Sequence, residues 1–99
     1  MPSQGNCRIG HEKLNITISI LPNEDGSAAI KSELVLGGRG SIETLGYKVV
    51  SARRIEHELE AFIGKAWNWF DVTGIRLSDD VMLRSSESVV AMLKKVRPS

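Results

Sequence analysis

The chain has 99 residues, of which 41% are hydrophobic and 25% charged. This length suits a single domain, which buries roughly two-thirds of its unfolded surface and needs neither disulfides nor a metal to supplement its core. The single cysteine, Cys7, excludes an intramolecular disulfide. The net charge of +1 argues against a protein that holds nucleic acid mainly through phosphate contacts, because such binding requires many cations.

The first 20 residues lack the apolar core of a signal peptide, and no apolar stretch approaches the roughly 20 residues of a membrane helix. We therefore expect a cytoplasmic protein that does not associate with membranes. Residues 1–10 show no hydrophobic periodicity and are rich in glycine and small polar residues. They are predicted to be a mobile tail in front of one α+β domain over residues 11–97.

The clearest local pattern lies at residues 13–21, where Leu and Ile alternate with Asn, Thr and Ser. This period-two alternation is typical of a half-buried strand. Pro22 cannot donate to a strand ladder, and the residues 23–26 that follow favour a turn. A second strand is predicted over residues 27–36. The glycine-rich residues 37–41 favour a hairpin turn over a phosphate-binding loop, because they lack the Walker lysine spacing.

A third strand is predicted over residues 41–50. Its alternation slips between Ile42 and Leu45, and Gly46 is a suitable place for a bulge or a break. Both connections are too short for a parallel crossover, so the three strands form an antiparallel meander. If their spatial order follows the sequence, strands 13–21 and 41–50 form the two edges of the sheet.

Two helices follow. Residues 52–70 have a helical period, with Ser51 as a candidate N-cap and Thr73-Gly74 as the stop. Residues 79–97 form a second apolar stripe, although serines dilute it and residues 79–85 also suit a strand. Ser78 is its candidate N-cap. A three-stranded sheet with one apolar face needs cover, so the predicted architecture is a two-layer α+β fold with both helices on one face.

Four of the five aromatic residues lie between Phe62 and Phe70, and they include Trp67 and Trp69. The two tryptophans fall on opposite margins of the apolar stripe of the first helix. They either close the edges of the core or anchor a partner, since large rings serve both purposes. We expect core packing to be the commoner use, and the marginal position keeps the partner-binding hypothesis open.

Arg53 and Arg54 lie in the first turn of the predicted helix, where cations oppose the helix dipole. One interpretation is an anion site that adds Arg39 from the glycine-rich turn. The simpler interpretation is ordinary helix pairing, with Arg54 bonded to Glu58 four residues later.

Strand 13–21 has a clean apolar face, and its polar face carries the uncharged residues Asn15, Thr17 and Ser19. As an edge strand it could pair with a partner or with a second copy, and Ile16 and Ile18 are then partner-binding residues. The alternative is that the N-terminal segment or a helix shields this edge.

The chain offers few groups for catalysis. It has two histidines, His11 and His57, and a projection of the helix directs His57 to solvent. Cys7 and His11 supply only two ligands where a structural zinc site needs four. We therefore expect no catalytic residue, no metal and no cofactor. The leading hypothesis is a small non-enzymatic protein-interaction module that can form a homodimer. The alternative is an anion- or nucleic-acid-binding module that uses the three arginines, and an enzyme is the third.

Overall fold

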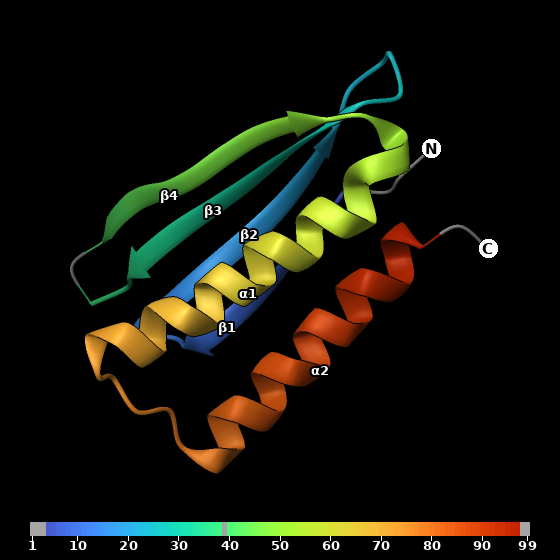
Figure 1. Cartoon of the computed structure of the whole chain (residues 1–99). Coiled ribbons are helices and arrows are strands. Elements are labelled where there is room, and N and C mark those ends of the chain that lie inside the picture. Colours follow the sequence, from blue (N-terminus) through green and yellow to red (C-terminus); the bar gives the residue numbers. More distant parts are fainter. Residues whose placement is uncertain (1–3, 39, 98–99) are drawn as a thin grey trace.

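The computed structural model describes residues 4–38 and 40–97 as a four-stranded antiparallel sheet covered on one face by two helices (Figure 1). The strand order is β1-β2-β3-β4, so neighbouring strands are also consecutive in the sequence. A single turn of 3-10 helix, Ala52–Arg54, precedes the first α-helix. The elements are β1 (Gly5–His11), β2 (Leu14–Pro22), β3 (Ala28–Leu36), β4 (Ser41–Val50), α1 (Ile55–Thr73) and α2 (Asp79–Val96).

The predicted count of three strands is wrong, because residues assigned to a mobile tail form β1. Cys7 and Ile9 are buried in the core, opposite Ile18 and Ile16 of β2. Gly10 has a φ of 117°, and a Cβ there would lie 2.5 Å from the carbonyl oxygen of Leu14. The glycine that suggested mobility is therefore required by the tight β1–β2 hairpin. Residues 1–3 of the predicted tail lie outside the described part of the chain.

The bulge predicted near Gly46 is confirmed. Ser32 of β3 lies opposite Gly46, and Glu33 lies opposite Thr44, so Leu45 is one residue more than β3 can match. Phe62 of α1 packs over this place, since a Cβ on Gly46 would lie 3.3 Å from the Phe62 ring. The missing side chain thus lets the helix approach β4 closely.

The helix boundaries follow the expected signals in part. Gly74 ends α1 with a φ of 74°, as predicted from the Thr73-Gly74 stop. Ser78 caps α2 by accepting a hydrogen bond from the backbone N–H of Val81, and residues 79–85 are helical. Ser51 makes no side-chain cap, because the backbone first forms a 3-10 turn and the α-helical hydrogen bonds begin later, at Ile55.

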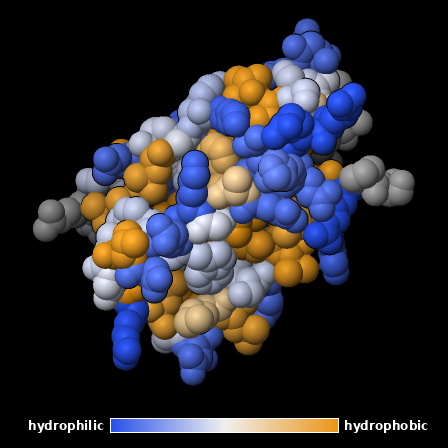
Figure 2. All heavy atoms as spheres, in the orientation of Figure 1, coloured by the Kyte–Doolittle hydropathy of each residue, from blue (hydrophilic) through white to orange (hydrophobic). Residues whose placement is uncertain are grey.

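The core lies between the sheet and the helices, where α1 crosses the middle of the sheet and α2 packs along β1 (Figure 1). The predicted apolar stripe of α1 is confirmed, and Leu59, which is fully buried, is at its centre. Viewed from the helix side, hydrophobic and hydrophilic residues are interspersed over the surface (Figure 2). Within the described residues, neither helix is long and apolar enough to cross a membrane.

Candidate functional site

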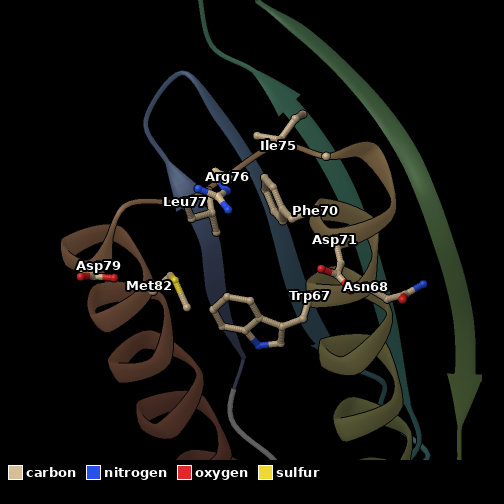
Figure 3. A pocket seen from close by; sticks show the side chains of 10 residues that line it. Trp67, Asn68, Phe70, Asp71, Ile75, Arg76, Leu77, Asp79 and Met82 are labelled. Carbon is tan, nitrogen blue, oxygen red and sulfur yellow. The ribbon is translucent and has the colours of Figure 1, made fainter.

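An open cleft lies where the C-terminal end of α1 faces the N-terminal end of α2 (Figure 3). Its volume is about 810 Å³, which is in the range of small-ligand and peptide-binding pockets. Both helices and the connection between them contribute to its walls. Its lining residues are Trp67, Asn68, Phe70, Asp71, Gly74, Ile75, Arg76, Leu77, Asp79 and Met82.

The shape of the cleft follows from the way the two helices are connected. The left-handed conformation of Gly74 turns the chain away from the axis of α1, and Ser78 starts α2 four residues later. Ile75 and Leu77 of this connection are half-buried against the core, together with the buried ring of Phe70. Met82, on the next turn of α2, is 45% exposed. The cleft therefore exposes apolar side chains of both helices and of their connection to solvent.

The two tryptophans have different surroundings. Trp67 is half-buried and extends from α1 towards α2 into the cleft (Figure 3). Trp69 is also half-buried, but it does not line this cleft; its ring meets Phe70 edge-on, with centroids 5.0 Å apart and an interplanar angle of 87°. Both rings pack against the core cluster. Of the two predicted anchors, only Trp67 contributes to the cleft.

The cleft carries charge as well as apolar surface. Asp71 on α1 and Asp79 at the start of α2 are exposed, and Arg76 from the connection is the cation among the lining residues. Asp79 also lies in the first turn of α2, where a carboxylate is favourable next to the helix dipole. The lining therefore has an excess of one negative charge around an apolar floor.

The arginines predicted to bind an anion are not gathered into one site. Arg54 donates to Glu58, with its Nη2 3.2 Å from Oε1, which confirms the predicted helix pair. Arg53 is exposed, and Arg39 lies outside the described residues.

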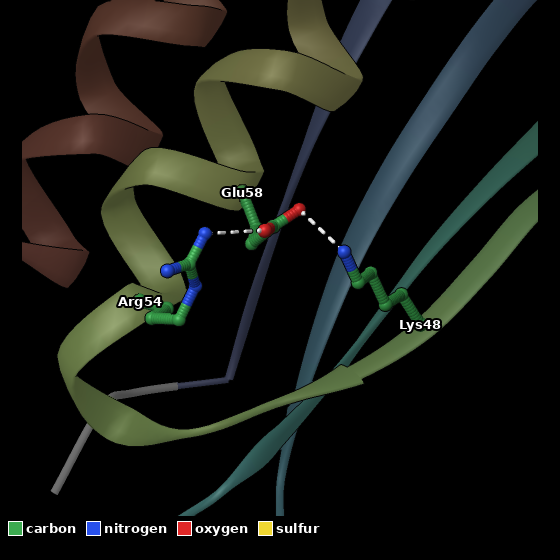
Figure 4. A network of polar contacts seen from close by, with 3 residues as sticks. All are labelled: Lys48, Arg54 and Glu58. Carbon is green, nitrogen blue, oxygen red and sulfur yellow. Dashed lines mark hydrogen bonds and ion pairs between the residues drawn. The ribbon is translucent and has the colours of Figure 1, made fainter.

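Glu58 has a second partner that the sequence does not indicate. Lys48 Nζ, from β4, lies 3.1 Å from Glu58 Oε2, so the carboxylate joins α1 to the sheet (Figure 4). The hydrogen bond from Lys48 and that from Arg54 hold the pKa of the Glu58 carboxyl below its usual range. This contact depends on the bulge in β4, which determines the face on which Lys48 lies.

The predicted sheet edge at β2 is wrong, because β1 pairs with it. Ile16 and Ile18 are both 0% exposed in the core, so they offer no surface to a partner in this fold. The edge lies instead at β1, and α2 covers it. The backbone N–H groups of Arg8 and Gly10 donate to Ser88 Oγ at 3.1 Å and to Ser85 Oγ at 3.0 Å. For strand 13–21 the expected alternative was shielding by the N-terminal segment or a helix, and the N-terminal segment provides it by pairing as β1.

A smaller hollow of about 380 Å³ lies beside this covered edge. It gathers exposed cations from distant parts of the chain, namely Arg8, Lys13 and Arg84, together with the carboxylate of Glu12. The sequence gives no sign of this grouping, since Arg84 lies on α2, far along the chain from the β1–β2 hairpin that carries Arg8, Glu12 and Lys13.

The histidines and the cysteine are placed apart. His57 is exposed, as predicted. Cys7 is buried, and burial raises the pKa of its thiol to about 11. Among residues 4–38 and 40–97, no group of three His, Cys, Asp or Glu side chains converges in a way that could hold a metal ion.

Comparison with protein-family models, with curated proteins and with solved structures finds no match to this chain.

Proposed function

We propose that the protein is a small non-enzymatic interaction module that binds a segment of a partner protein in the cleft, with Trp67 as the main contact. The observation that supports this proposal is the combination of an indole and an exposed methionine on facing walls of one open cleft. Aromatic residues in such pockets carry much of the energy of protein interfaces, and methionine adapts its shape to varied partners.

The charges in the cleft indicate the chemistry of the partner. Asp71 and Asp79 outnumber Arg76, so a bound segment gains from a cation beside its apolar side chain. We therefore propose that the partner presents a large apolar side chain with a lysine or an arginine next to it. The apolar group would cover Trp67 and Met82 while the cation lies near the carboxylates.

The alternative, an anion- or nucleic-acid-binding module, stays a prediction. Because Arg54 is bonded to Glu58, a ligand at this helix start would have to compete with a carboxylate for the guanidinium group. Arg53 takes part in none of the described ion pairs, so no carboxylate competes for it there. One exposed cation is nevertheless a weak basis for phosphate binding.

The test is a selection of random peptides displayed on phage against the wild-type protein, followed by affinity measurements on two matched variants. Met82→Gln removes apolar surface from the cleft. Leu83→Gln removes it from the neighbouring position, which is 61% exposed and does not line the cleft. We expect selected peptides to pair a large apolar residue with a lysine or arginine, and to bind Met82→Gln about tenfold more weakly.

The control variant should bind the same peptides as tightly as the wild type does. The proposal is wrong if repeated selection yields no binding peptide, or if the two substitutions weaken binding equally. Melting curves of both variants show whether either substitution disturbs the fold, and we expect neither to do so because both side chains are exposed.

A further inference from the structure

A second surface lies at the opposite edge of the sheet from α2. Within the described residues β4 is paired on one side only, with β3. Ile42, Tyr47 and Val49 are 63%, 61% and 54% exposed, which is unusual for three large apolar side chains on one strand. An edge strand of ten residues with this much apolar surface is a template for pairing with another strand.

The bulge in β4 decides which side chains share a face. Before the bulge, Ile42 lies opposite Val35 of β3, and after it Val49 lies opposite Ala29. Val35 and Ala29 are six residues apart, so both lie on the same face of β3. Ile42 and Val49 therefore share the face away from the helices although they are seven residues apart.

The same shift places the two charged residues of β4 together on the helix side. Lys48 lies opposite the core residue Ile30, and Glu43 lies opposite Leu34, which packs against the core. Glu43 and Lys48 are thus five residues apart on one face of the strand. In a strand without a bulge, an odd separation would put them on opposite faces.

We propose that two copies of the chain pair through β4 as an antiparallel, two-fold-related dimer. When the symmetry axis passes between Leu45 and Gly46, Ile42 lies opposite the second copy's Val49, and Glu43 opposite the second copy's Lys48. Each of these pairs joins residues that share a face, apolar with apolar and acid with base. The pairing is isologous, so every favourable contact occurs twice.

Two features of β4 are ones that proteins use to protect an edge strand from pairing with other strands. An inward-pointing lysine and a bulge both discourage edge-to-edge pairing, because they bury a charge or twist the strand. Here Lys48 would meet a carboxylate from the second copy on one side while it keeps Glu58 on the other. The bulge brings the acid and the base onto one face, so the edge rejects unrelated strands and accepts its own copy.

This dimer goes beyond the proposed partner binding and uses a different part of the molecule. The cleft is formed by α1, α2 and their connection, and no residue of β4 lines it. A dimer through β4 therefore leaves both clefts accessible, and the two proposals can fail separately.

The test is sedimentation equilibrium of the wild type and of charge variants of β4. We expect a concentration-dependent dimer that Glu43→Lys and Lys48→Glu each weaken at least about tenfold, since each places like charges opposite one another at two symmetric positions. Glu43→Lys is the cleaner variant, because the Glu43 side chain takes part in no described ion pair. A mixture of the two single variants should restore the dimer, as should the double variant.

Ile42→Lys tests the dimer independently, through the face of β4 that lies away from the helices. Its side chain is exposed, so the substitution should weaken the dimer and leave unchanged the melting temperature measured at concentrations where the protein is monomeric. The proposal is overturned if the wild type stays monomeric over the accessible concentration range. It is equally overturned if a dimer forms whose dissociation constant is the same in the wild type, in the two single charge variants, in their mixture and in the double variant.

Discussion

Ser85 Oγ lies 3.0 Å from the backbone nitrogen of Gly10 and 2.7 Å from the carbonyl oxygen of Val81, so one buried hydroxyl joins the edge strand β1 to α2. The hydroxyl accepts from the strand and donates to the helix. It satisfies an edge N–H that would otherwise be buried without a partner, which explains a serine in the apolar stripe of the helix.

Replacing this hydroxyl should destabilise the protein. We expect Ser85→Ala to cost about 1–3 kcal/mol in the free energy of unfolding, because the buried N–H of Gly10 loses its acceptor. Ser86→Ala is the matched control, since Ser86 is exposed on the same helix and gains the same helix propensity. Urea unfolding measures the difference, and equal stability of the two variants would show that the Ser85 contact contributes nothing.

The Glu58 carboxylate should make stability depend on pH. Its hydrogen bonds to Lys48 and Arg54 lower its pKa from the ordinary value of 4.5. The stabilisation is therefore fully present above that value, and it is lost as pH falls through the lower pKa of the folded state. We expect Glu58→Gln to melt below the wild type at neutral pH, with the difference shrinking as the pH falls below 4.5.

The exposed Glu60 on the same helix gives the control for this titration. Glu60→Gln should follow the wild type at every pH, because its side chain takes part in no described ion pair. A Glu58→Gln variant whose melting temperature runs parallel to that of the wild type down to acidic pH would contradict the network in Figure 4.

The thiol of Cys7 should be unreactive in the folded protein. It is 1% exposed, and burial raises its pKa to about 11, so little thiolate is present at neutral pH. We expect iodoacetamide at about pH 8 to label the native protein at least about 100-fold more slowly than the protein in concentrated urea. Mass spectrometry follows the labelling. Equal rates would mean that residues 5–11 form a mobile tail and not β1.

The local patterns of the sequence predict much of the fold. Three correctly predicted features depend on residues that are close together in the chain. They are the alternation in residues 13–21, the turn at 23–26 and the slip near Gly46. β1 is not predictable in this way, since only Cys7 and Ile9 alternate in it. β1 also depends on contacts distant in sequence, among them the hydrogen bonds to Ser85 and Ser88, which lie 75 and 80 residues further along the chain than the backbone groups they bind.

The candidate site is predictable in part for the same reason. The marginal position of Trp67 on its helix indicates an accessible indole, and the structure places it in the cleft. The other wall depends on where Gly74 directs the chain and on the distance between two helices, and neither is encoded in a local pattern. Met82 lies within residues 79–97, which are predicted to carry an apolar stripe, but its side chain is 45% exposed and faces the cleft.

The most direct test of partner binding in the cleft compares the two tryptophans within one spectrum. Each indole N–H gives its own signal in a ¹H–¹⁵N correlation spectrum, and assignment by Trp67→Phe and Trp69→Phe distinguishes them. On titration with a phage-selected peptide, the Trp67 signal should shift strongly while the Trp69 signal, from outside the cleft, stays close to its position. A dominant shift of Trp69, or a peptide that binds without moving Trp67, would contradict the proposed function.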